Sequence, residues 1–135
     1  MLRYMLDTNI VIYVMKRRPL AALEVFNRHA GAMCISSITL SELCHGAEKS
    51  ERREHSLRHV ESFVSRLEVL PYGAKAAMHY GSIRAMLERQ GQIIGENDLH
   101  IAAHARSEGL TLVSNNLREF ERVPGLLLEN WVGQG

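Results

Sequence analysis

The clearest hydrophobic pattern in the chain is that of residues 95–105, which predicts a helix carrying an acid on its apolar side. At about 100° per residue, Asp98 shares a face with Ile101 and Ala102, in a stripe of small apolar residues suited to packing on a sheet. Burial of an unpaired carboxylate is unfavourable, so Asp98 needs a cation or another partner that the helix does not supply. The alternative is that Asp98 only caps the helix, a role that Asn97 could equally fill.

Elsewhere in the chain, short apolar runs alternate with longer amphipathic segments. The short runs predict strands at residues 2–6, 33–38, 68–70 and 110–113, with an edge strand at 126–128. The other segments predict helices at residues 10–15, 20–29, 51–67, 75–90 and 117–122, and a further helix that opens at Thr39. Strands that alternate with helices are typical of a parallel sheet covered on both faces. We therefore predict an α/β protein, folded as one domain over residues 1–135.

The composition changes this picture mainly by what it excludes. The net charge of +1 rules out nucleic-acid binding through an overall basic field, so such contacts need a local patch. Thirteen of the sixteen basic residues are arginine, which suits phosphate, although compositional bias explains the excess equally well. The candidates are Lys16, Arg17 and Arg18, with Arg84 and Arg89 on the long helix. With two unpaired cysteines, no leader and no apolar run of membrane length, we expect a soluble cytoplasmic protein without membrane contact.

Polar residues follow the predicted strands at the points where the strands end. Asp7 comes directly after the first strand, Glu42 lies on the helix after the second, and residues 114–119 follow the fourth. The carboxyl ends of parallel strands meet at one edge of a sheet, where ligands bind in such folds, so these groups should converge. Asp98, at the start of its helix, can point into the same cleft.

Several carboxylates in one cleft repel each other unless a divalent cation lies among them. Oxygen ligands without a paired Cys/His set favour Mg²⁺ or Mn²⁺ over zinc. Such an ion polarises a phosphoryl oxygen and activates water for in-line attack on a phosphodiester. The cleft therefore predicts nuclease chemistry.

Three alternatives compete with this interpretation. Glu42 has the spacing of a capping box that begins at Thr39. It also faces a groove, because Gly46, one helical turn away on the same side, has no side chain. His100 and His104 have the i, i+4 spacing of a helical zinc pair, but they point away from Asp98 and lack the glutamate of a zinc-protease motif. Asp7 could also be a phosphate-accepting nucleophile at a strand end.

Four short segments, in order over nearly the whole chain, resemble PIN-domain toxins and more narrowly their VapC type. They are residues 6–9 (LDTN), 41–43 (SEL) with Gly46, 97–105 (NDLHIAAHA), and 114–116 (SNN) with Glu119 and Phe120. The resemblance implies a three-layer α/β/α domain with a central, mainly parallel sheet of four to five strands. It also implies a Mg²⁺-dependent endoribonuclease toxin of a type II toxin–antitoxin system, with Mn²⁺ as the alternative metal.

The resemblance further implies the roles of the site residues. It assigns the metal ligands to Asp7, Glu42 and Asp98. Many PIN domains have Asp at a fourth acidic position where this chain has Asn116, while the carboxylate of Glu119 lies one turn further on. Either Glu119 completes the catalytic acids or Asn116 serves as a neutral oxygen ligand. The groups expected to orient carboxylates or water are Thr8, Asn9, Ser114 and Asn116.

The resemblance also implies partners. RNA is the expected substrate, with initiator tRNA cut in its anticodon loop as the leading expectation, and a homodimer is the expected assembly. A VapB-type antitoxin should cover the site, where a ring of carboxylates is a natural receptor for an inserted arginine. Two other functions stay open on the residues alone: a HAD-like phosphohydrolase that uses Asp7, and a non-catalytic RNA-binding or interaction module.

Overall fold

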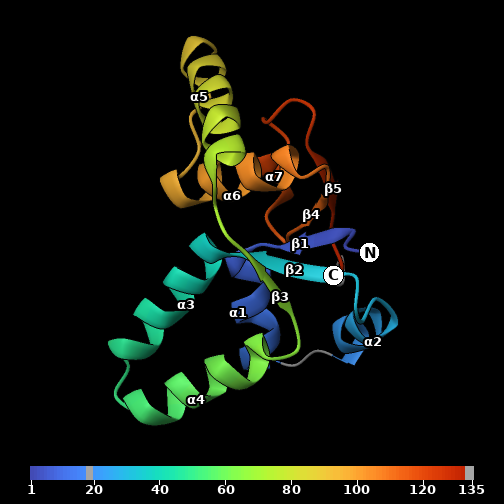
Figure 1. Cartoon of the computed structure of the whole chain (residues 1–135), viewed down its shortest axis with the longest axis vertical. Coiled ribbons are helices and arrows are strands. Elements are labelled where there is room, and N and C mark those ends of the chain that lie inside the picture. Colours follow the sequence, from blue (N-terminus) through green and yellow to red (C-terminus); the bar gives the residue numbers. More distant parts are fainter. Residues whose placement is uncertain (18–19, 133–135) are drawn as a thin grey trace.

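A five-stranded parallel sheet forms the centre of the computed structural model, which describes residues 1–17 and 20–132 (Figure 1). The strands lie in the order β3-β2-β1-β4-β5, and every neighbouring pair is parallel. They are β1 (Tyr4–Leu6), β2 (Met33–Ser36), β3 (Glu68–Leu70), β4 (Thr111–Val113) and β5 (Leu127–Glu129). The order reverses between β1 and β4, and such a switch point opens a crevice at the carboxyl ends of the strands.

Helices cover both faces of this sheet. One face packs against α1 (Thr8–Arg17), α2 (Leu20–Arg28), α3 (Ser37–Glu48) and α4 (Arg53–Val64). The other face packs against α5 (Ala74–Arg89), α6 (Glu96–Ser107) and α7 (Leu117–Phe120). Figure 1 shows these two helical layers above and below the strands. The predicted three-layer α/β/α fold is confirmed, with a sheet whose five described strands are all parallel.

The alternation of side chains along β1 explains why the protein has two apolar cores. Tyr4 and Leu6 pack with the α1–α4 layer, whereas Met5 between them packs with the α5–α7 layer. On that second side, α6 is buried along most of its length, from Leu99 to Ser107. The small residues predicted to pack on the sheet therefore do so, and α6 fixes the position of Asp98.

Two of the predicted element boundaries differ from the structure because a side chain caps the helix that follows. The strand predicted to run to residue 38 ends at Ser36, because the Ser36 hydroxyl accepts a hydrogen bond from the backbone N–H of Ile38 at 3.1 Å and so caps α3. The helix thus begins at Ser37, and the capping box considered for Thr39 and Glu42 does not form. The first helix likewise begins at Thr8 rather than at residue 10, because the Asp7 carboxylate accepts a hydrogen bond from the backbone N–H of Ile10.

No helix in the described parts of the chain is long and apolar enough to cross a membrane.

Candidate active site

Asp7 lies buried at the carboxyl end of β1, beside the point where the strand order reverses. Its Oδ1 accepts a hydrogen bond from the backbone N–H of Ile10 at 2.7 Å, and its Oδ2 accepts one from the Ser114 hydroxyl, also at 2.7 Å. Burial nevertheless raises the pKa of Asp7 to about 6, because it outweighs these two donors, and the charge of Glu42 adds to the rise. A cation beside Asp7 would stabilise its charged form.

Glu42, on α3, is held by residues from two other helices. The hydroxyl of Thr8, the first residue of α1, donates to its Oε1, and the Nδ2 of Asn97 on α6 donates to its Oε2 at 3.0 Å. The Thr8 hydroxyl also lies 3.2 Å from that of Thr39, with which it is hydrogen-bonded. These contacts fix the carboxylate where α1, α3 and α6 meet.

Asp98 lies in the first turn of α6, but it does not cap that helix. The helix begins after Gly95, and no side chain accepts from its first N–H groups as a cap. Burial, together with the charges of Glu119, Asp7 and Glu42, raises the pKa of Asp98 to about 6. Asp98 is therefore within electrostatic reach of the other three carboxylates, and the capping interpretation is wrong.

Glu119, on α7, approaches Asp98 across Gly95. Its Oε1 accepts from the backbone N–H of Gly95 at 2.8 Å, and its Oε2 accepts from the Nδ2 of Asn116 at 3.0 Å. A Cβ added to Gly95 would lie 3.7 Å from Asp98 Oδ2 and 3.7 Å from Glu119 Oε1, so this glycine lies between the two carboxylates. The structure therefore brings the carboxylate of Glu119 close to Asp98, and the amide of Asn116 holds its other oxygen.

The donor chemistry of this cleft fits a hard divalent cation. All four carboxylates offer oxygen atoms, and the repulsion that raises the pKa of Asp98 is what a cation among them would relieve. Within residues 1–17 and 20–132, no three His, Cys, Asp or Glu side chains are gathered closely enough to form a ready-made metal cage. The four acids are therefore neighbours in an open cleft and do not form a closed cage.

The polar residues predicted to orient the acids fall into two groups. Thr8, Ser114 and Asn116 each bond a carboxylate of the cleft, to Glu42, Asp7 and Glu119 respectively. Asn9 is exposed on α1, and among the described residues no hydrogen bond of its side chain is recorded. The predicted role of Asn9 in orienting a carboxylate or water stays a prediction, because no contact of its side chain with the cleft supports it.

Sequence reasoning missed Asn97 and Thr39 as parts of the cleft. Asn97 was considered only as a helix cap, and its bond to Glu42 joins residues 55 positions apart. The only local signal was its place directly before Asp98. Thr39 was considered only as a cap, and it contributes the hydroxyl bonded to Thr8.

The two histidines of the zinc alternative have separate partners. His100 Nδ1 lies 2.8 Å from the Tyr72 hydroxyl, and its Nε2 lies 3.2 Å from Glu96. His104 is buried, and its Nδ1 lies 2.8 Å from the Ser36 hydroxyl. Burial lowers the pKa of His104, so this imidazole is neutral at pH 7. His104 therefore joins α6 to the end of β2, while His100 contacts Tyr72 and Glu96.

Glu96 belongs to the contact between α5 and α6. The sequence indicates no role for this additional acid beside the cleft. The Tyr80 hydroxyl donates to its carboxylate, and Arg84 lies 3.7 Å from it while also bonding Tyr80 at 2.8 Å. The His100 ring stacks on that of Tyr80 with centroids 4.2 Å apart. Glu96 thus joins the two helices on the side of α6 away from Asp98.

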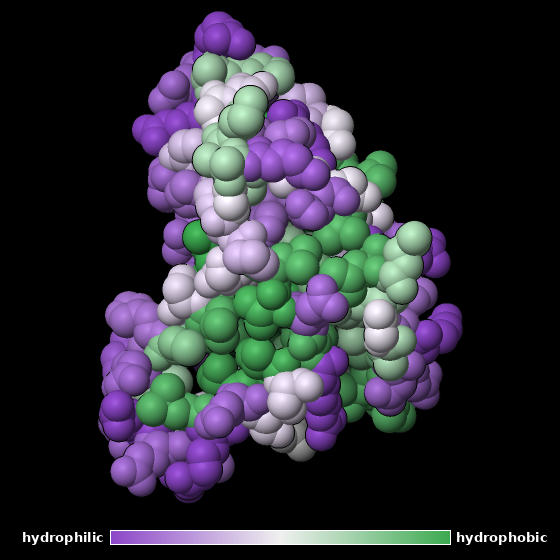
Figure 2. Space-filling model, viewed as in Figure 1, coloured by the Kyte–Doolittle hydropathy of each residue, from purple (hydrophilic) through white to green (hydrophobic). Residues whose placement is uncertain are grey.

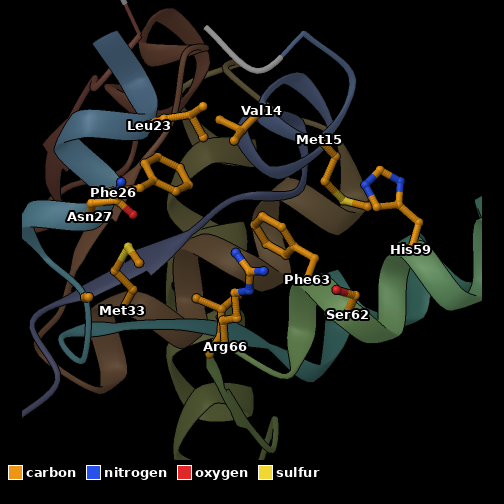
Figure 3. Close-up of a pocket in the computed structure, with 12 residues that line it drawn as sticks. Val14, Met15, Leu23, Phe26, Asn27, Met33, His59, Ser62, Phe63 and Arg66 are labelled. Carbon is orange, nitrogen blue, oxygen red and sulfur yellow. The ribbon is translucent and has the colours of Figure 1, made fainter. Parts of the chain in front are cut away.

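A cavity between the helices of the α1–α4 layer lies apart from the acids. It measures about 450 Å³ and is lined by α1, α2, α4 and the start of β2, with Val14, Phe26 and Phe63 among its walls (Figure 3). None of the twelve described residues that line it is acidic. Apolar residues gather in the middle of the face in Figure 2, while polar residues cover α5 and the outer end of the α3–α4 pair. Among its described residues this cavity has no carboxylate that could hold a divalent cation.

A parallel α/β sheet with an all-oxygen acidic cleft at its switch point is typical of enzymes that hydrolyse phosphate esters with a divalent cation, nucleases among them. Comparisons with known proteins agree. The profile of the PIN domain matches residues 4–126. A Haemophilus influenzae protein named ribonuclease VapC2 is 66% identical over 132 residues, which cover 98% of this chain and all of the relative. A Shigella flexneri protein named tRNA(fMet)-specific endonuclease VapC is 56% identical over 131 residues, covering 97% of this chain and 99% of the relative.

The structural comparison gives the same result. The toxin chain in a crystal structure of DNA-bound VapBC from Salmonella typhimurium superposes with a TM-score of 0.96 at 55% identity, covering 98% of this chain and all of that one. The chain therefore belongs to the PIN-domain family and, within it, to the VapC ribonucleases. The resemblance stated from the sequence is confirmed, and neither the phosphohydrolase nor the non-catalytic module is favoured.

Proposed function

We propose that this chain is a Mg²⁺-dependent endoribonuclease toxin, in which Asp7, Glu42 and Asp98 hold the metal and Glu119 is the fourth catalytic acid. The observation that carries the proposal is that these four carboxylates, from the end of β1 and from α3, α6 and α7, lie within electrostatic reach of Asp98, with the pKa of Asp7 and of Asp98 raised to about 6. Mn²⁺ offers the same hard, octahedral coordination and should substitute.

A bound divalent ion supplies charge for the phosphoryl oxygens and a more acidic water as nucleophile. The protein's own contribution is to hold its oxygen atoms in place before the substrate arrives. Ser114 and the N–H of Ile10 fix both oxygens of Asp7, and the N–H of Gly95 fixes one oxygen of Glu119. These donors also stabilise the charged forms, and so they keep the acids available to a cation.

For the substrate we propose initiator tRNA, cut in its anticodon loop. Two relatives, 56% and 55% identical and almost fully covered, carry the name tRNA(fMet)-specific endonuclease VapC. Backbone phosphates need cations outside the acidic cleft, and Lys16 and Arg89 are exposed with no ion pair among the described residues. Arg84 already bonds Tyr80 and Glu88, so it is the weaker candidate. Arg18 and the side chain of Arg17 lie outside the described residues.

For the partner we propose a VapB-type antitoxin, because the superposed crystal structures are those of VapBC complexes. An arginine inserted among Asp7, Asp98 and Glu119 would pair with the same oxygens that a cation needs. We also propose that the toxin is a homodimer and acts in the cytoplasm, where tRNA is found.

The proposal is tested by cleavage of purified RNA. Initiator tRNA and elongator methionine tRNA transcripts are incubated with the protein in Mg²⁺, in Mn²⁺ and in EDTA, and the new ends are mapped. We expect metal-dependent cuts in the anticodon loop of the initiator alone. Attack by water leaves a 5′-phosphate, whereas attack by the ribose 2′-hydroxyl leaves a 2′,3′-cyclic phosphate. Cleavage that persists in EDTA contradicts the metal role, and cyclic ends contradict attack by water.

A matched pair of variants controls this experiment. Asp98→Asn should lose cleavage, whereas Glu61→Gln, which changes an exposed carboxylate on α4, should retain it. Full activity of Asp98→Asn would remove Asp98 from the site.

A further inference from the structure

A groove lined by α1, α3 and α4 begins at Glu42 and leads away from the acidic cleft. Its volume is about 350 Å³, within the range of small-ligand sites. Apolar side chains from the three helices, those of Ile12, Leu43 and Val60, line it. Because Glu42 belongs both to the cleft and to this groove, a ligand in the groove would be continuous with one at the acids.

Gly46 keeps the groove open one helical turn beyond Glu42. It lies in the middle of α3, where a glycine destabilises a helix relative to alanine. A Cβ added there would meet no atom within 4 Å, so neither backbone strain nor a tight contact inside the protein requires glycine. The missing side chain instead leaves free space against the groove that Gly46 lines.

Two of the three lysines in the chain line the groove, at positions away from the acids. Lys16 comes from α1 and Lys49 from the end of α3, and both are exposed. Over the described parts of the chain neither forms an ion pair, whereas the third lysine, Lys75, lies 3.7 Å from Glu108. The groove therefore combines an apolar wall with the positive charges of Lys16 and Lys49, and Glu42 lies at the end nearest the acidic cleft.

We propose that this groove is a nucleotide subsite, which binds the RNA strand next to the bond that is cut. The sugar or base lies against the apolar wall over Gly46, and the backbone phosphates contact Lys16 and Lys49. The positive charges of Lys16 and Lys49 favour a polyanion over a peptide with few acidic residues, because lysine ammonium groups neutralise phosphates. This assignment rests on the proposed ribonuclease function, and it adds a place for the substrate beyond the carboxylates.

Binding is measured without cleavage, in an Asp98→Asn background with EDTA, by the anisotropy of a labelled anticodon stem-loop of initiator tRNA. Gly46→Gln places a side chain in the groove, and we expect it to weaken binding about tenfold, as a misfit in a binding pocket does. The control is Gly81→Gln, on α5, where an added Cβ also meets nothing within 4 Å. Gly81→Gln should bind RNA as the parent does, and thermal melting should show both variants folded.

The lysines are tested through the salt dependence of the same binding. The double variant Lys16→Gln/Lys49→Gln should lower the slope of log Kd against log salt by about 1.4, for two phosphate contacts to a single strand. Lys75→Gln should leave the slope unchanged. Equal Kd values and slopes in the groove variants and their controls overturn the proposal.

Two further outcomes separate this proposal from its neighbours. If Gly46→Gln leaves RNA binding intact but weakens inhibition by the antitoxin, the groove belongs to the protein partner and the RNA assignment is overturned. If the wild-type protein with Mg²⁺ leaves initiator tRNA uncut, the proposed function fails. Weaker binding by the groove variants in EDTA would still support the subsite in that case.

Discussion

Removal of one carboxylate from the cleft should stabilise the metal-free protein. Ionised Asp98 is unfavourable in the folded state, because burial and the charges of Glu119, Asp7 and Glu42 raise its pKa from 3.8 to about 6. A rise of that size corresponds to about 3 kcal/mol at neutral pH. Asp98 keeps partial contact with solvent, and screening reduces the figure to about 1–2 kcal/mol. Asp98→Asn removes the charge and keeps the shape of the side chain.

The sign of this effect depends on pH in a defined way. Between pH 3.8 and about 6 the folded state binds more protons at Asp98 than the unfolded state does. The destabilisation is therefore absent below that window and complete above it, so the stability of the wild type falls as pH rises. For a chain of this length, Asp98→Asn should melt about 3–8 °C higher than the wild type at pH 7.5 in EDTA.

Thermal melting of both proteins, with Glu61→Gln as the control, tests this reasoning. The advantage of Asp98→Asn should shrink at pH 4 and should also shrink when Mg²⁺ stabilises the wild type. A variant that melts at or below the wild-type temperature at pH 7.5, or whose advantage is equal at both pH values, would refute the account of a repulsive cleft.

Three further predictions concern the rate, the inhibitor and the groove. The rate of RNA cleavage at limiting Mg²⁺ should rise as the pH passes through about 6, because protonated Asp7 and Asp98 cannot hold a cation. Ser114→Ala removes a hydrogen-bond donor to Asp7, so in this variant the rise should occur at higher pH. Raising the Mg²⁺ concentration at a fixed concentration of the toxin–antitoxin complex should restore RNA cleavage, and replacement of the inserted antitoxin arginine by Ala should relieve inhibition. If neither change relieves inhibition, the antitoxin binds outside the acidic cleft. Gly46→Ala should raise the free energy of unfolding by about 0.5–1 kcal/mol in a urea titration.

The carboxyl ends of β1 and β4 were predictable, while the contacts between helices were not. Asp7 and Ser114 follow apolar runs, and parallel pairing alone brings them to one edge of the sheet. The bond from Asn97 to Glu42 depends on how α6 crosses α3, which no local pattern encodes. The end of β2 was misplaced because Ser36 continues an apolar run, and only its hydroxyl bond reveals a cap.

The distance along the chain between Asp7 and Ser114 has a consequence for how the protein is made. Their hydrogen bond joins residues 107 positions apart, and β1 lies between β2 and β4 in the sheet. A growing polypeptide emerges from the ribosome N-terminus first, so it cannot complete this cleft until β4 and α7 have been synthesised. A nascent chain that stops short of these elements is incomplete at its reactive centre, and translation itself delays the appearance of activity until most of the molecule exists.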